Sequence, residues 1–250
     1  MSGRLDGRVA AITGASSGIG EATALALANE GAAIALGARR EDRIEALRQR
    51  IEDGGGRALA LRVDVTDEQD AHAFVRGAHS ELGGLDVLVN NAGVMLLGPI
   101  EGADTEQWRR MVDVNVLGLL YCTQAALPLM REGGGGHIVN VSSVAGRVGN
   151  PGSAVYNATK WAVVGFSEAL RKEAGPSKIR VTCVEPGFVR TELQGHNENP
   201  VVRQAIERME EEIGEIMEAD DIAEAIRYAV CQPPRVNVNE LLIRPTGQAR

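Results

Sequence analysis

Aromatic residues and positive charge are both scarce in this sequence. Aromatic residues make up 3% of its 250 residues, and the formal net charge is -8 at pH 7. An acidic protein repels a phosphate backbone, and so few aromatic side chains offer little on which bases can stack. We therefore expect no nucleic acid among its partners.

Cysteine is rare, and the spacing of the three cysteines suggests neither a disulfide pair nor a metal site. Cys122, Cys183 and Cys231 lie far apart, are odd in number and lack the short spacing of a metal site. Cysteines of this kind suit a reducing compartment, where they pack as small apolar side chains. The sequence predicts no metal site and a cytoplasmic location.

Long apolar runs are missing as well. The most apolar region, Val114 to Met130, is interrupted by four residues: Asn115, Thr123, Gln124 and Pro128. A helix that spans a bilayer needs about 20 mostly apolar residues. Residues Met1 to Arg8 include Asp6 and precede an apolar run too short for a secretory signal. We expect neither a membrane span nor an export signal.

What the sequence does contain is an alternation of strand and helix patterns. Seven β-branched runs predict strands at Arg8–Thr13, Ala32–Gly37, Ala58–Val63, Asp86–Asn90, His137–Ser142, Ile179–Val184 and Glu240–Ile243. Amphipathic patterns between them predict helices at Glu21–Glu30, Glu41–Asp53, Asp67–Glu81, Thr105–Arg131 and Ala154–Ala174. This rhythm is typical of βα units. We predict an α/β, doubly wound Rossmann fold with a seven-stranded parallel sheet and helices on both faces.

The length fits a single dinucleotide-binding catalytic domain over residues 1–250, because no linker or composition shift divides the chain. Residues 192–221 are the one long departure from the βα rhythm, and we expect a substrate lid there. The functional residues are expected at the carboxyl ends of the strands.

A glycine-rich turn follows the first predicted strand and leads directly into a helical pattern. Glycines let the backbone approach a pyrophosphate, and the helix start offers free N–H groups and a positive dipole end. The residues predicted to contact such a ligand are Gly14, Ser16, Ser17, Gly18, Ile19 and Gly20. The alternative is a turn that serves only the packing of strand against helix.

This turn is the first of several motifs whose order resembles the short-chain dehydrogenase/reductase family. The others are Asn90-Asn91-Ala92-Gly93, Asn115, the strand end Val139–Ser143, Tyr156-x-x-x-Lys160 and Pro186-Gly187. The resemblance covers nearly the whole chain. By position it implies cofactor contacts from Asp64, Val65, Asn91, Ala92, Gly93, Pro186, Gly187, Val189 and Thr191.

Some of these positions have simpler explanations. Asp64 is equally well placed to cap the helix that begins near Asp67. The Asn91–Gly93 and Pro186-Gly187 segments are also typical of ordinary turns.

The end of the second strand indicates which nicotinamide cofactor is used. It reads Gly37-Ala38-Arg39-Arg40, without the carboxylate that binds the ribose hydroxyls of NAD. Arg39 and Arg40 suit a 2′-phosphate, which accepts charge-assisted hydrogen bonds. The sequence thus predicts NADP(H), although both arginines also fit the start of a solvated helix.

Tyr156 and Lys160 are four residues apart in a helical pattern, so their side chains share one face. A nearby cation lowers the pKa of a tyrosine from its usual value of about 10. We predict that Tyr156 exchanges a proton with the substrate oxygen while a hydride moves at carbon. By resemblance, both residues also contact the cofactor, Lys160 through the ribose. A surface pair of no function is the alternative.

Two further residues complete the predicted catalytic set. Ser143 closes the fifth strand and is predicted to hydrogen-bond the substrate oxygen, with Ser142 as its competitor. Asn115 resembles the family's helix asparagine, which connects the lysine to solvent through water. An amide bonded to backbone inside a kinked helix is compatible with that role.

These observations predict an NADP(H)-dependent oxidoreductase that interconverts an alcohol and a ketone or aldehyde on a small molecule. A non-catalytic dinucleotide-binding sensor would lack part of the serine, tyrosine and lysine set. A 3-oxoacyl carrier-protein reductase is disfavoured by Glu207–Asp221, which holds eight acidic residues and one basic residue. An epimerase or dehydratase would need a longer chain.

The chain end and the long helices suggest a substrate class and an assembly. Val236–Thr246 resembles a branch that contains hydroxy-amino-acid dehydrogenases and clavaldehyde dehydrogenase, so we expect small polar aldehydes, ketones or 3-hydroxy acids. Trp108–Met130 and Ala154–Leu170 are apolar helices of the kind that family members pair in dimers or tetramers. We expect a homo-oligomer, most simply a homotetramer; burial inside the monomer is the alternative.

Overall fold

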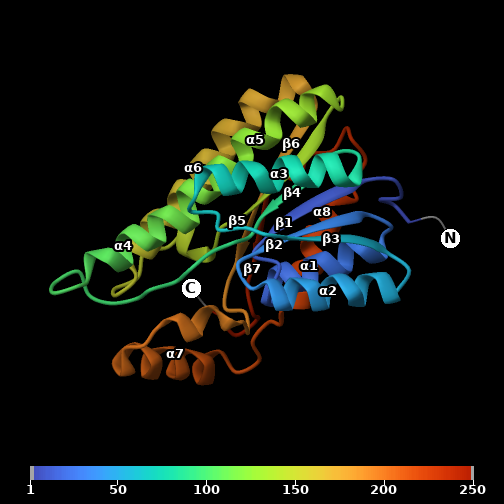
Figure 1. Ribbon diagram of the computed structural model, residues 1–250. Helices are drawn as coiled ribbons and strands as arrows, with labels where there is room; N and C mark the ends of the chain where they lie inside the picture. The colour runs from blue at the N-terminus through green and yellow to red at the C-terminus, as the bar shows by residue number, and fades with distance from the viewer. Residues whose placement is uncertain (1–2, 249–250) are drawn as a thin grey trace.

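The computed structural model describes residues 3–248 and shows one parallel sheet between two helical layers (Figure 1). Its strands are β1 (Val9–Thr13), β2 (Ala33–Ala38), β3 (Arg57–Arg62), β4 (Val87–Asn90), β5 (Gly136–Val141), β6 (Ile179–Pro186) and β7 (Glu240–Ile243). Across the sheet they follow the order β3-β2-β1-β4-β5-β6-β7. The predicted doubly wound fold is confirmed, and its order reverses between β1 and β4, where such sheets bind ligands.

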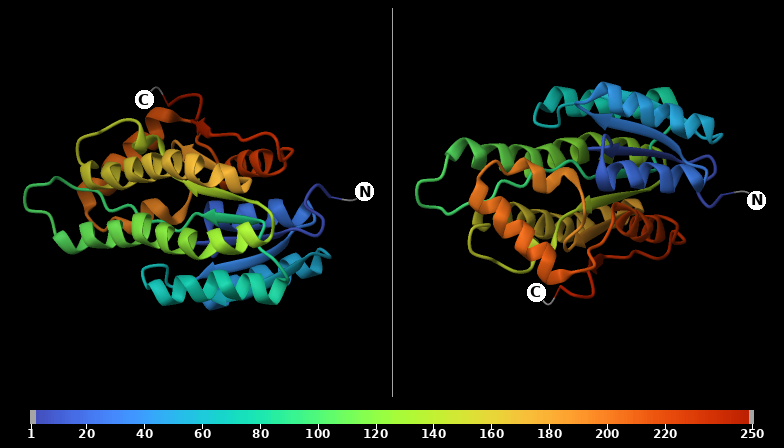
Figure 2. Two further views of the ribbon diagram at one scale, coloured as in Figure 1. Left: turned by 90° about the horizontal axis from the view of Figure 1, so that it is seen from above. Right: turned by 90° about the horizontal axis from the view of Figure 1, so that it is seen from below.

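Alternation along each strand divides the apolar residues between two cores. On β1, Ala10 and Ile12 face one core, whereas Val9 and Ala11 face the other. The first core is covered by α1 (Gly18–Asn29), α2 (Glu41–Asp53) and α8 (Ala219–Val230), and the second by α3 (Glu68–Leu82), α5 (Gly118–Glu132) and α6 (Ala154–Ala174). The two views in Figure 2 show these layers from opposite sides. A sheet buried on both faces explains the nearly continuous apolar strands.

The longest predicted helix is interrupted in the structure. Between α4 (Thr105–Val112) and α5 the backbone forms a π-helical turn, Asp113–Leu117, which places Asn115 at its centre. The combined helix Thr105–Glu132 is long and apolar enough to cross a membrane by length and composition alone. One side of it is nevertheless packed on the sheet, because Cys122, Ala126 and Met130 are fully buried.

The region predicted as a lid contains no strand of the sheet. A 3₁₀ turn covers Glu192–His196, and α7 covers Pro200–Ile213. Helix α7, orange in Figure 1, stands apart from the two helical layers, below the carboxyl ends of the strands. A single bridge from Val189 to Met217 ties the segment back toward the sheet.

The central strands should dominate stability. Leu88 on β4 is fully buried, so Leu88→Ala should lower the free energy of unfolding by about 2–5 kcal/mol. Ile100→Ala is the control, because Ile100 is 53% exposed and its truncation should cost about 0.5 kcal/mol or less. Urea unfolding measures both. Equal losses in the two variants would contradict this description of the core.

Candidate active site

A cleft of about 1260 Å³ opens at the carboxyl ends of the strands. Of the residues predicted from sequence to form the site, Gly20 and Asn115 lie outside its lining. The others all line it: Gly14, Ser16, Ser17, Gly18, Ile19, Arg39, Arg40, Asp64, Val65, Asn91, Ala92, Gly93, Ser143, Tyr156, Lys160, Pro186, Gly187, Val189 and Thr191. Residues separated by up to 177 positions in the chain therefore share one cavity.

Hydrogen bonds connect the glycine turn to the end of β4. Asn91 Nδ2 donates to the carbonyl oxygens of Thr13 (3.0 Å) and Gly14 (3.2 Å), and Thr13 Oγ1 accepts from the Asn91 and Ala92 amides. Gly14 has φ +68°, and a Cβ there would lie 2.8 Å from Asn91 Nδ2. A Cβ on Gly20 would lie 2.3 Å from the Gly14 oxygen, so Gly20 serves the packing alternative.

Helix α1 begins at Gly18 with its first amides open. Its N-cap residue, Ser17, makes no side-chain capping bond. The first turn of a helix has N–H groups without intrahelical partners, and Gly18 and Ile19 of this turn line the cleft. The arrangement suits an anion at this point.

The two arginines after β2 differ in their contacts. Arg40 donates to Ser16 Oγ (2.9 Å from Nη2) and to Ser17 Oγ (2.8 Å), and its Nη1 forms a 2.7 Å ion pair with Glu192. Arg39 is exposed and makes no hydrogen bond or ion pair within residues 3–248. Arg39 is therefore the guanidinium available to a ligand without breaking an existing bond.

Glu192 is a residue of the cleft that the sequence does not predict. Besides Arg40 it pairs with Arg43 at 2.5 Å, and the bonds from Arg43 and Arg40 lower the pKa of its carboxyl to about 2. Nothing in the local sequence marks it, because it lies 152 residues from Arg40. It joins the start of the lid segment to the arginines at the cleft.

Asp64 does not cap helix α3. The N-cap is Asp67, whose carboxylate accepts from the Asp70 amide. Asp64 instead accepts from the amide (3.1 Å) and the hydroxyl (2.8 Å) of Thr66. Burial opposes ionisation of Asp64, yet the two bonds from Thr66 bring its pKa below the usual value. The helix-cap alternative is thus wrong, and an ionised carboxylate lines the cleft.

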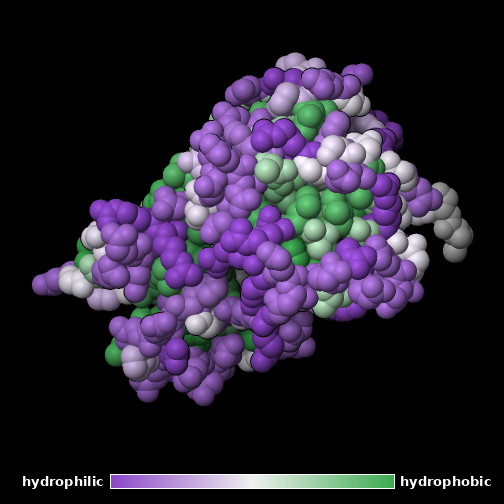
Figure 3. All heavy atoms as spheres, viewed as in Figure 1, coloured by the Kyte–Doolittle hydropathy of each residue, from purple (hydrophilic) through white to green (hydrophobic). Residues whose placement is uncertain are grey.

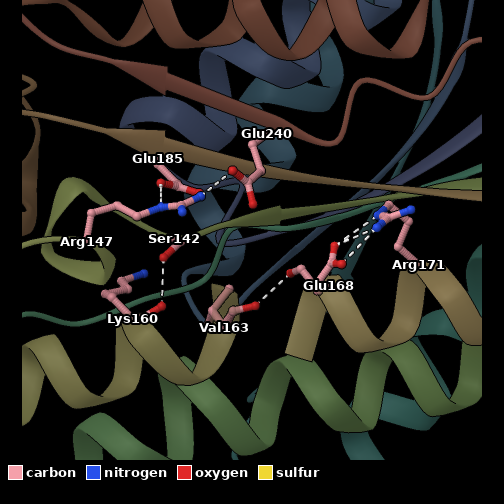
Figure 4. Close-up of polar contacts among 9 residues, drawn as sticks. Ser142, Arg147, Lys160, Val163, Glu168, Arg171, Glu185 and Glu240 are labelled. Carbon is pink, nitrogen blue, oxygen red and sulfur yellow. Dashed lines mark hydrogen bonds and ion pairs between the residues drawn. The ribbon is translucent and has the colours of Figure 1, made fainter. Parts of the chain in front are cut away.

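Tyr156 and Lys160 lie on one face of α6, each 6% exposed. Lys160 Nζ lies 5.7 Å from the centroid of the Tyr156 ring and donates to the Val141 carbonyl at 3.1 Å. Ser143 shares a hydrogen bond with Tyr156, and its Oγ also lies 3.3 Å from the Pro186 carbonyl. Ser142 donates to the Lys160 carbonyl at 2.9 Å, so its hydroxyl holds β5 to α6 (Figure 4).

Burial, rather than the lysine, dominates the titration of this pair. It raises the pKa of Tyr156 to about 12, against the weaker effect of the Ser143 hydrogen bond. It lowers the pKa of Lys160 to about 8. The lowered tyrosine pKa that the spacing predicts is not found, because desolvation penalises both charged forms. At neutral pH the phenol is protonated and ready to donate.

Asn115 connects the loop after β4 to helix α6. Its Oδ1 accepts from the Val94 amide (2.8 Å), while Nδ2 donates to the Val94 carbonyl (2.9 Å) and to Thr159 Oγ1 (3.1 Å). The structure thus contains the alternative named for Asn115, an amide bonded to the backbone within a kinked helix. A Cβ on Gly93 would lie 3.4 Å from Asn115 Oδ1 and 3.8 Å from Lys160 Nζ, so this loop closely approaches both.

Comparison with known proteins agrees with this geometry. Residues 8–201 match the family model for short chain dehydrogenases. The chain belongs to the short-chain dehydrogenase family. An uncharacterized oxidoreductase of Staphylococcus saprophyticus is 43% identical over 244 residues, which cover 97% of each chain.

Two solved structures of short-chain dehydrogenases share the fold. An alcohol dehydrogenase from the archaeon Thermococcus sibiricus, complexed with 5-hydroxy-NADP, has a TM-score of 0.86 and 32% identity, covering 97% of this chain and 98% of its own. The closed form of a serine dehydrogenase complexed with NADP+ has a TM-score of 0.89 and 31% identity, covering 97% of this chain and 96% of its own.

A buried ion pair supports two loops of this short-chain dehydrogenase. Glu185 is fully buried and accepts from Arg147 Nε (2.5 Å) and Nη2 (2.6 Å), and Glu240 also pairs with Arg147 (Figure 4). Arg147 follows Ser143 by four residues, and Glu185 directly precedes Pro186. The pair therefore holds the loop between Ser143 and Arg147 against the end of β6. Sequence spacing does not reveal this contact either.

The cysteines do not form a site in the described chain. Cys122 and Cys183 are buried, Cys231 is half-buried, and all three are free. Burial raises the pKa of Cys122 to about 12, as expected for a packing residue. Among residues 3–248, no group of three or more His, Cys, Asp or Glu side chains is placed to hold a metal ion.

The buried lysine should reduce the stability of the protein without cofactor. Its pKa is about 8 in the folded chain against 10.5 ordinarily, so the unfolded state binds more protons between these values and stability rises with pH across that window. Lys160→Met should therefore raise the free energy of unfolding at pH 7 by about 1–3 kcal/mol.

That advantage should shrink as the pH rises from 8 to 10.5, because folded Lys160 is then neutral and unfolded Lys160 progressively loses its proton. Denaturant unfolding at pH 7, 9 and about 10.5 gives the comparison. Burial raises the pKa of folded Tyr156 to about 12, so the phenol stays protonated in both folded proteins, and its ionisation in the unfolded state cancels in the difference. A variant less stable than wild type at pH 7, or a difference in stability independent of pH, would show that burial does not penalise the charged form of Lys160.

Proposed function

We propose that this chain is an NADP(H)-dependent oxidoreductase that interconverts an alcohol and a ketone or aldehyde on a small molecule. The observation that carries the proposal is the single cleft in which the glycine turn meets Ser143, Tyr156 and Lys160. Two solved relatives with the same fold hold NADP or an NADP derivative, which supports the choice of cofactor.

The residues present fit this cofactor. The backbone at Gly14 leaves no space for a Cβ, and the open amides of α1 suit the pyrophosphate. We assign Asp64 and Val65, which line the cleft after β3, to the adenosine end, as the family resemblance implies. The same cleft is lined by two further loop segments, with residues Asn91, Ala92 and Gly93 in one and Pro186, Gly187, Val189 and Thr191 in the other. When bound, the cofactor supplies or accepts the hydride.

The protein residues handle the proton. In reduction, the Tyr156 hydroxyl donates its proton to the carbonyl oxygen as the hydride reaches the carbon, and the alcohol leaves neutral. Ser143 donates a hydrogen bond to the same oxygen, in place of its 3.3 Å contact with Pro186. Lys160, 5.7 Å from the ring, stabilises the phenolate that remains. Asn115 holds the neighbouring loop and helix through Val94 and Thr159, and we propose that the water connection from Lys160 to solvent passes beside it.

Selection of NADP(H) rests on charge at the end of β2. Ala38 provides no carboxylate for the ribose hydroxyls, whereas Arg39 is available and Arg40 faces Ser16 and Ser17. Glu192 competes with a 2′-phosphate for Arg40, since both are anions within reach of one guanidinium. Arg39 is therefore expected to carry most of the preference.

The competing functions are less well supported. A dinucleotide sensor does not require Ser143, Tyr156 and Lys160 at one end of the cleft. A carrier-protein reductase would bring an acidic partner to α7, whose outer face contains Glu207, Glu210 and Glu211. Steady-state oxidation of NADPH by a carbonyl separates an enzyme from a sensor.

We further propose a cytoplasmic homo-oligomer, a dimer or tetramer. Trp161 on α6 is 51% exposed and Val112 at the end of α4 is 40% exposed, on the helices expected to pair. Tyr228 on α8 and Leu242 on the edge strand β7 are also exposed, at 55% and 49%, and are further apolar residues that a second copy could bury. Three free cysteines fit a reducing compartment.

Tyr156→Phe tests the proton donor. The ring remains, so cofactor binding should be nearly unchanged, while turnover should fall by about 10²-fold or more. Stopped-flow or steady-state NADPH oxidation measures turnover, and titration of NADPH fluorescence measures binding. Near wild-type turnover in the purified variant would contradict the mechanism.

Arg39→Ala tests the cofactor preference. It removes charge-assisted hydrogen bonds, so kcat/KM with NADPH should fall about ten- to a hundredfold while kcat/KM with NADH stays nearly constant. Ala38→Asp should shift the preference toward NADH. Glu192→Gln should improve NADPH use, because the competing anion is gone. Equal losses of kcat/KM for both cofactors in Arg39→Ala would show that these arginines only form the solvated start of a helix.

A further inference from the structure

Helix α7 presents an apolar stripe to the cleft. Val202, Ile206, Met209 and Ile213 recur at helical spacing and line the cavity together with Val201, Ala205 and Glu212. The remaining charged residues of the helix, Arg203, Glu207, Arg208, Glu210 and Glu211, are not part of the lining. A helix with one apolar and one charged face is built to cover an apolar surface.

The protein covers this stripe only in part. Ile206 is buried and Val202 and Ile213 are half-buried, whereas Met209 is 46% exposed and the adjoining Val201 is 74% exposed. Figure 3 shows hydrophobic atoms in the notch between the α7 lobe and the body of the molecule. Large apolar side chains clustered at a cavity and left in water indicate a binding surface.

A set of apolar residues from outside α7, called here the facing wall, lines the same cavity as the stripe. It includes Val94, Met95 and Leu97 from the loop after β4, and Val144, Phe188 and Leu193 from other loops. Asn197 ties the segment that leads into α7 to this wall, since its Oδ1 accepts from the Leu97 amide (2.7 Å) and its Nδ2 donates to the Met95 carbonyl (3.1 Å). Ser143 and Tyr156 line the same cavity, so the apolar space is continuous with the reacting groups.

Four cations line the whole cavity, and none of them belongs to the stripe or to the apolar wall: Arg39, Arg40, Arg110 and Lys160. Arg39 and Arg110 also border a smaller neighbouring cavity with Asp64, Arg40 is bonded to Ser16, and Lys160 is buried and donates to the Val141 carbonyl. Burial lowers the pKa of His196, which leaves it neutral at pH 7. Within the described chain, the stripe and the facing wall contribute Glu212 as their charged side chain and no cation.

We propose that the substrate is an uncharged ketone, aldehyde or alcohol whose apolar body packs between the α7 stripe and the facing wall. This inference rests on the proposed function and names the substrate class of that site. A carboxylate in this space would lose water without gaining a counter-charge, which is costly. The small polar aldehydes and 3-hydroxy acids expected from the chain end do not match such a lining.

A homologous series measures the proposed contact. For straight-chain methyl ketones, kcat/KM with NADPH should rise about three- to fourfold for each added methylene until the cavity is filled. Keto acids of matched length, with the carboxylate at the far end, should be at least about tenfold poorer. A flat length dependence, or preference for the acids, would overturn the proposal.

Variants on the two faces of α7 locate the contact. Met209→Asn should flatten the length dependence by raising KM for long ketones, with little change for the shortest. Met209→Leu should restore it. Glu210→Gln, on the charged face, is the matched control and should leave the series unchanged. Sedimentation should be the same for all; if Met209→Asn instead dissociates an oligomer, a second copy covers the stripe and the proposal fails.

Binding separates this proposal from the proposed function. Calorimetric titration of long ketones into the protein loaded with NADPH should show affinity that grows with chain length and a negative heat-capacity change, as burial of apolar surface gives. If ketones bind in this way but none is reduced, the substrate class stands and the oxidoreductase proposal fails. If short or acidic carbonyls alone bind and react, the oxidoreductase proposal stands and the proposed substrate class fails.

Discussion

Lys160 is held inside the protein, with its ammonium on the Val141 carbonyl and its side chain beside Tyr156. Burial disfavours the charged forms of both Lys160 and Tyr156, so the pair reduces the stability of the fold. Hydrogen bonds from neighbouring segments therefore have to hold it in position. Ser142 bonds the Lys160 carbonyl, and Asn115 bonds Thr159 one residue earlier. The carboxyl edge of the sheet is arranged around this helix, and the cofactor turn and the apolar cavity both open next to it.

Much of the fold was predictable because its signals are local. Strand alternation, helical spacing and the glycine turn each involve a few neighbouring residues, and all seven strands were placed within two residues at either end. The site was predictable where a motif names it, as with Tyr156 and Lys160. The π-helical turn at Asn115 was not, because it changes the helical repeat without changing the apolar pattern.

The remaining features depend on contacts between distant segments. Glu192 reaches Arg40 across 152 residues, and Asn197 reaches Leu97 across 100. Their side chains carry no sequence signal, since each would be ordinary on a surface. The titration of Tyr156 was also mispredicted, because spacing reveals a neighbouring charge but not the depth of burial that outweighs it. The stripe on α7 had a recognisable period, yet its role depends on the facing wall that lines the same cavity.

The proposed function requires that a hydride moves between a nicotinamide and a carbonyl in the cleft. This transfer can be followed with NADPH that carries deuterium at the reactive nicotinamide carbon, incubated with a long methyl ketone, and with mass spectrometry of the product. We expect an alcohol that carries one deuterium from one face of the nicotinamide. Bound NADPH without any labelled alcohol, across neutral ketones and aldehydes, would contradict the proposed function.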